Sequence, residues 1–146
     1  MNARARGMAL VELIVAMGIA LTAIGVGYQI YNACLKADDR AARRETMTLA
    51  VQNLMARVKQ DVRVARSISV SGGALVTSGE RGRVSYRSAS GGVERSTGRG
   101  RCVFRDISAR FEGGSGGVKV RLTSDARVHR RPIHIEVESY VASRNR

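Results

Sequence analysis

A single glutamate within a long apolar run is the first feature of this sequence that could do chemistry. Residues 8–31 contain 18 apolar residues out of 24, and Glu12 is the only charged residue among them. A carboxylate near the centre of a membrane-spanning helix costs on the order of 2.5–3.5 kcal/mol on insertion scales. We therefore expect Glu12 to have a cationic partner and to act by charge pairing.

The residues before the apolar run predict its orientation. As a helix, residues 8–31 would extend about 36 Å, which is enough to cross a hydrocarbon layer of about 30 Å. Arg4 and Arg6 precede the run, and no acid accompanies them. Arginines next to a span tend to stay in the cytoplasm. The sequence therefore predicts one membrane span, with the rest of the chain outside the cytoplasm.

Two ordinary cleavage signals fit this run poorly. An ordinary secretory signal could use Ala23 and Gly25 as its small residues, but the apolar stretch continues to Ile30. A lipoprotein signal would need aliphatic and small residues before Cys34, where Tyr31 and Asn32 stand instead. Neither interpretation explains the glutamate.

A third interpretation places cleavage between Gly7 and Met8, so that the span is retained. Glu12 would then be the fifth residue of the mature chain, about 6 Å along the helix from the new α-amino group. That amine, from a neighbouring subunit, could pair with the carboxylate in an apolar filament core. The simpler alternative is that Glu12 lies close enough to the lipid headgroups to reach them, with no further role.

The run Gly7-Met8-Ala-Leu-Val-Glu12-Leu-Ile-Val-Ala-Met-Gly18-Ile resembles the class III signal of type IV pilins and type II secretion pseudopilins. The resemblance implies that a prepilin peptidase cuts the Gly7–Met8 bond and N-methylates Met8. It also implies that Glu12 sets the register of the subunit in a helical filament. Two departures are Met8 in place of the commoner phenylalanine and the absence of a helix-breaking proline. We expect Gly25 and Gly27, near the usual place of that proline, to let the helix bend.

Residues 35–68 are predicted to continue the helix. Their apolar side chains recur every three or four residues as one stripe, formed by Met47, Val51, Leu54, Val58, Val62, Ala65 and Ile68. Glycine and proline are absent from residues 28–71. We expect a single helix from about residue 9 to 68, about 90 Å long, whose first half lies in membrane or filament core and whose second half covers a sheet.

From Ser71 onward the apolar residues alternate with polar ones. This pattern predicts strands near residues 74–77, 83–87, 92–97, 101–112, 118–122 and 133–141, with a hairpin at 113–117. Alternation is typical of an antiparallel sheet that a helix covers on one face. The predicted fold class is α+β. The predicted division is a basic leader at 1–7, a span at 8–31 and an extracytoplasmic domain at 32–146.

A second resemblance concerns the region after the span. The run at residues 52–68, the order Val84 then Tyr86, and the run at residues 92–95 (Gly-Val-Glu-Arg) look like J-type or PilW-like minor subunits. A major pilin is the less favoured alternative, because the C-terminal region lacks the cysteine pair found in many of them.

Other chemistry finds little support. Cys34, near the membrane boundary, and Cys102, in a predicted strand, are not expected to meet the Cα spacing that a disulfide requires. His129 and His134 lack the ligand spacing of a metal site. Arrangements typical of nucleophilic catalysis and phosphate-binding loops are also absent. We therefore expect no enzyme activity, no cofactor and no metal.

The remaining signal is positive charge. Residues 72–131 contain 13 basic and 5 acidic residues. A candidate patch for anions or nucleic acid consists of Arg81, Arg83, Arg87, Arg95, Arg99 and Arg101. Clustered cations release counterions from phosphates, but the few aromatic residues limit base stacking. We favour a basic surface that complements acidic partner subunits or anionic lipid.

Taken with the resemblance, these features predict a minor pilin or pseudopilin, a structural subunit of a type IV pilus or type II secretion pseudopilus. It would be a single-pass inner-membrane protein that then enters the filament. Its expected partners are prepilin peptidase, other pilins, the inner-membrane assembly platform and the lipid bilayer. Two alternatives stay open: a DNA-binding minor pilin of a competence pilus, and a single-span anchor for an unrelated extracytoplasmic domain.

Overall fold

The computed structural model describes the backbone of residues 3–80, 82–114 and 116–142, and side chains from Leu10 onward within those ranges. One helix, α1 (Ala3–Val64), is followed by eight strands. The chain divides into two compact units, residues 1–41 and residues 42–146, and α1 contributes to both. The predicted domain boundaries at residues 7 and 31 stay predictions.

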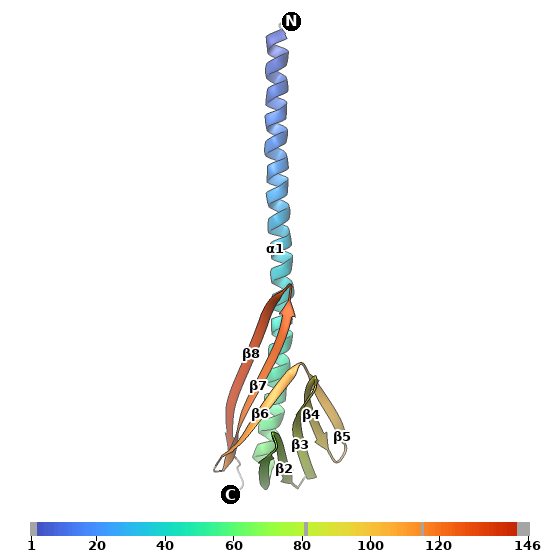
Figure 1. Ribbon diagram of the computed structural model, residues 1–146, viewed down its shortest axis with the longest axis vertical. Helices are drawn as coiled ribbons and strands as arrows, with labels where there is room; N and C mark the ends of the chain where they lie inside the picture. Colours follow the sequence, from blue (N-terminus) through green and yellow to red (C-terminus); the bar gives the residue numbers. More distant parts are fainter. Residues whose placement is uncertain (1–2, 81, 115, 143–146) are drawn as a thin grey trace. The chain divides into compact units, whose positions relative to one another are not determined.

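The strands form two antiparallel sheets in place of the one that the sequence predicts (Figure 1). The five-stranded sheet has the order β1 (Ser67–Ser71), β2 (Ala74–Gly79), β3 (Gly82–Ala89), β4 (Gly92–Thr97), β5 (Gly100–Arg105). The three-stranded sheet has the order β6 (Ile107–Gly114), β7 (Gly117–Val128), β8 (Arg131–Ala142). Sequence neighbours pair throughout each sheet, so short hairpin turns make all these connections. The first turn has both Gly72 and Gly73 at positive φ (57° and 74°), a conformation that glycine adopts without steric cost.

The strand predicted over residues 101–112 is two strands in different sheets. β5 ends at Arg105, β6 begins at Ile107, and Asp106 between them has a φ of +58°. Aspartate tolerates this left-handed conformation better than most residues. The turn changes which alternate positions point inward: Phe104 packs against the core before it, and Ile107 belongs to the core after it. Val103 therefore points outward, whereas an unbroken strand over residues 101–112 would place it on the same face as Ile107.

The helix ends earlier than predicted. α1 stops at Val64, and Ile68, predicted to be the last member of the helical stripe, lies in β1. The backbone N–H of Arg66 donates to the carbonyl of Ser78 at 2.8 Å, which is already a contact with β2. Ile68 and Val70 alternate with serines, and both pack against the core. The strand therefore covers these apolar side chains without a further turn of helix.

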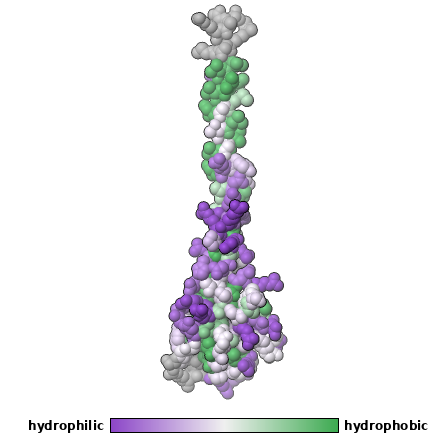
Figure 2. Space-filling view, viewed as in Figure 1, coloured by the Kyte–Doolittle hydropathy of each residue, from purple (hydrophilic) through white to green (hydrophobic). Residues whose placement is uncertain are grey.

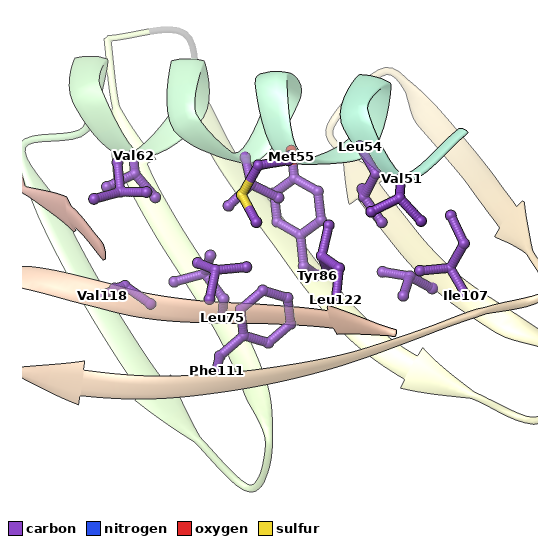
Figure 3. Close-up of a cluster of buried hydrophobic side chains, with 14 residues drawn as sticks. Val51, Leu54, Met55, Val62, Leu75, Tyr86, Ile107, Phe111, Val118 and Leu122 are labelled. Atoms are coloured by element: carbon purple, nitrogen blue, oxygen red, sulfur yellow. The ribbon is translucent and has the colours of Figure 1, made fainter. Parts of the chain in front are cut away.

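The core of residues 42–146 lies between α1 and the inner faces of both sheets. The predicted stripe supplies the helix side, and Met47, Val51, Leu54, Val58 and Val62 are at most 4% exposed. Figure 3 shows side chains of α1 directed at residues from both sheets, which include Leu75, Tyr86, Phe111 and Leu122. This arrangement confirms the predicted α+β class, with a long N-terminal helix packed on antiparallel strands.

Candidate functional site

The helical segment Leu10–Tyr31 has no core of its own. Its large apolar side chains are each between 51% and 68% exposed, from Val26 at the low end to Ile24 and Tyr28 at the high end. Figure 2 shows the hydrophobic colour over this part of α1. The helix is long and apolar enough to cross a membrane. A surface of this extent is typical of a lipid-facing or helix-packing segment.

Polar groups in this segment are few, and two polar side chains, one within it and one directly after it, bond to the helix itself. The Thr22 hydroxyl donates to the carbonyl of Gly18 at 2.8 Å, and the Asn32 amide donates to the carbonyl of Tyr28 at 3.0 Å. The carboxylate of Glu12 differs from both. It is exposed, and no described side chain donates a hydrogen bond to it or pairs with it. A partner for this charge would therefore have to come from outside the described side chains.

The predicted processing residues lie at the start of α1. Gly7 and Met8 are helical in their backbone, but the side chain of Met8 lies outside the described part of the chain. α1 also passes through Gly25 and Gly27 without interruption, and nothing lies within 4 Å of a Cβ built at either position. Bending at these glycines stays a prediction.

The structure separates the predicted basic patch. Arg83, Arg87 and Arg101 share the outer face of the five-stranded sheet, because the register pairs Arg87 with Glu94 and Ser96 with Arg101. Arg95 lies on the opposite face and contacts the helix, and Arg99 lies in the turn between β4 and β5. Arg81 lies outside the described residues. The outer face also gains Arg105, which the predicted patch omitted.

Arg95 belongs instead to a three-residue cluster that joins α1 to the sheet. The Tyr86 hydroxyl donates to Oδ2 of Asp61 at 2.5 Å, and Arg95 donates to the same oxygen from Nε and a terminal nitrogen at 3.0 and 2.9 Å. Arg95 Nε also donates to the Tyr86 oxygen at 3.0 Å. We call this set the Asp61–Tyr86–Arg95 cluster. It fixes the end of the helix against β3 and β4.

Burial decides the electrostatics of this cluster. Burial, followed by the hydrogen bond to Asp61, raises the pKa of Tyr86 well above its usual value of 10, so the phenol stays protonated and remains a donor. Burial alone would lower the pKa of Arg95, but its hydrogen bonds to Tyr86 and Asp61 raise it. The sequence carried one signal for this cluster, since Arg95 stands two residues after Val93 and so on the core side of β4.

An exposed histidine on β8 gives a titration that can be tested. The hydrogen bond between Nδ1 of His134 and Oδ1 of Asp125, 2.7 Å long, raises the pKa of His134 above 6.5, and Glu136 adds to the effect. We expect the NMR titration midpoint of His134 to lie above 6.5 and to fall in Asp125→Asn. Because the folded-state pKa is raised, the associated stabilisation is full below the unfolded-state pKa and is lost as pH rises through the folded value. A midpoint that Asp125→Asn leaves unchanged would contradict this assignment.

The two cysteines are free and exposed, Cys34 on α1 and Cys102 on β5. His129 occupies the turn between β7 and β8 with a φ of +49°. Within the described residues, no group of three or more His, Cys, Asp or Glu side chains is placed to hold a metal ion.

Comparison with protein-family models, with curated proteins and with solved structures finds no match to this chain. The class of the protein therefore rests on its own architecture. An apolar N-terminal helix continues into a helix that packs on antiparallel sheets, and this is a pilin-like topology.

Proposed function

We propose that this protein is a minor pilin or pseudopilin, a structural subunit that enters a type IV pilus or a type II secretion pseudopilus through its N-terminal helix. One observation carries the proposal. The single helix α1 is apolar and unburied over Leu10–Tyr31, yet supplies the core of two antiparallel sheets over Met47–Val62. The first segment needs lipid or other helices to cover it, and the second holds a folded domain on the same helix.

The sequence at the start of α1 supports the same proposal. A short basic leader ends at Gly7, and Glu12 would be the fifth residue after cleavage. The mechanism is assembly rather than catalysis. Packing of apolar helices supplies the free energy of association, and Glu12 fixes the register against the α-amino group of a neighbour. The partners are prepilin peptidase, the inner-membrane assembly platform, the bilayer and other pilins.

Processing at Gly7–Met8 is the direct test. We expect the full chain, coexpressed with a prepilin peptidase, to lose residues 1–7 and to gain the mass of one methyl group at the amine of Met8. Intact-mass spectrometry of the membrane fraction measures both changes. Gly7→Leu should stay full length, whereas Gly18→Ala, a change at a helical glycine with open space around it, should be processed normally. A chain that keeps residues 1–7 would be an unrelated single-span anchor.

A further inference from the structure

We propose that β5 and the outer face of the sheet beside it form a docking site for an extended, acid-rich strand of a neighbouring subunit. The inference rests on the proposed function for the existence of that neighbour and adds its chemistry. We call this site the β5 edge. It consists of Arg101, Val103 and Arg105 on β5, with Arg83 and Arg87 on β3 and Glu94 on β4.

The backbone of β5 is available along one side. β5 is the last strand of its sheet and pairs only with β4, from Thr97 with Gly100 to Gly92 with Arg105. Within the described residues, no other strand pairs with β5. An edge of this kind binds an added strand through main-chain hydrogen bonds, while pockets and charges on alternate side chains select the sequence.

The centre of the β5 edge is apolar and uncovered. Val103 points away from the core and is 52% exposed, and only one other large apolar side chain of the described strands, Tyr140, is comparably exposed. Cys102, on the other face of β5, is exposed as well. A strand laid beside β5 would cover both side chains. The exposure of Val103 thus marks the edge as a surface that a partner can bury.

The charge of the β5 edge selects the partner. Arg101 and Arg105 flank Val103 on the same face, and the register places Glu94 between Arg87 and Val103. Glu94 pairs with Arg101, at 2.7 Å between Oε1 and Nε. No described carboxylate pairs with Arg83, Arg87 or Arg105. Four arginines face one carboxylate, so an incoming strand with acidic residues at alternate positions complements the site.

The same charges disfavour a second copy of β5. Two β5 strands paired antiparallel would place arginine opposite arginine, and like charges directly opposite destabilise a sheet. At the β8 edge of the three-stranded sheet, by contrast, the charges are already paired. On β8, Glu138 pairs with Lys119 at 2.9 Å and with Arg121 at 2.6 Å, and Glu136 pairs with Arg121 at 3.2 Å. Unbalanced charge beside an uncovered apolar residue is therefore a property of the β5 edge and not of every edge in the molecule.

Peptide binding to the full chain in detergent micelles tests the proposal. The probe is a peptide of alternating glutamate and valine. Its comparisons are a peptide of the same composition with the glutamates consecutive, a peptide of alternating lysine and valine, and duplex DNA. We expect the first peptide to slow amide hydrogen exchange in Gly100–Arg105. The double variant Arg101→Glu, Arg105→Glu should bind it about tenfold more weakly and should now bind the lysine peptide, which also shows that the variant is folded.

The control variant is Arg127→Glu, Arg131→Glu, which makes the same charge change at exposed positions near the turn between β7 and β8. It should bind the acidic peptide as the unmodified chain does. Equal loss in both variants would show a response to net charge alone and would overturn the proposal. So would equal protection of the same amides by the consecutive-glutamate peptide or by DNA. If the chain keeps residues 1–7 but binds the acidic peptide at β5, the proposed function is contradicted and the docking site at the β5 edge is supported.

Discussion

Replacing Glu12 by leucine should leave the chain in the membrane and processed, but should exclude it from the filament. The substitution favours the span itself, because it removes a carboxylate that costs on the order of 2.5–3.5 kcal/mol in hydrocarbon. The free energy of filament assembly changes in the opposite direction. In the proposed filament, the substitution leaves the α-amino group of the neighbouring subunit without a partner in an apolar core. Breaking a buried ion pair costs about 3 kcal/mol or more, which corresponds to about a hundredfold less incorporation.

The measurement is the ratio of the chain in the sheared filament fraction to the chain in the membrane fraction, in native cells. Glu45→Leu is the matched control, because Glu45 is an exposed glutamate on the same helix but outside the apolar segment. It should enter filaments as the unmodified chain does. Incorporation of Glu12→Leu at the wild-type level would contradict the pairing of Glu12 with a neighbour, whatever happens to the leader.

Local periodicity explains which features of the fold were predictable. The stripe from Met47 to Val62 is confirmed because three- and four-residue spacing reports directly on one face of a helix. The limits of α1 and β5 were not predictable in the same way. Ile68 satisfies both a helical and a strand pattern, and a left-handed aspartate at residue 106 interrupts a run that otherwise alternates. The sequence therefore predicts strand-rich structure there but not its division into two sheets.

The same limit applies to the contacts between elements. Arg95 carries the charge of a surface residue. Its spacing from Val93 places it on the inner face of β4, but only the pairing of β3 with β4 shows that it lies opposite Tyr86. The same strand pairing places Arg87, Arg101 and Arg105 together on the outer face of the sheet. Contacts of this kind depend on which residues of separate strands lie opposite each other, and spacing along the chain does not specify that.

Replacing Asp61 by alanine should destabilise residues 42–146 by about 2–4 kcal/mol. The substitution leaves the Arg95 guanidinium and the Tyr86 hydroxyl without their acceptor. Tyr86 is fully buried, whereas the side chains of Asp61 and Arg95 are 17% and 22% exposed. Water can therefore reach the ion pair in part, and the expected loss lies below that of a fully buried pair. Urea unfolding of the full chain in detergent, followed by the circular dichroism of the sheets, measures the change.

Glu80→Ala is the control for Asp61→Ala, because it breaks the exposed ion pair of Glu80 with Arg66. Exposed pairs contribute about 1 kcal/mol at most, so this variant should unfold close to the unmodified chain. The double variant Asp61→Ala, Arg95→Ala should lose less stability than the two single variants added together, because removing Arg95 also removes the unpaired charge. Additive losses, or equal losses in Asp61→Ala and Glu80→Ala, would mean that the ion pair does not hold the helix to the sheet. The apolar stripe of α1 would then hold the helix against the sheet without a contribution from the Asp61–Arg95 ion pair.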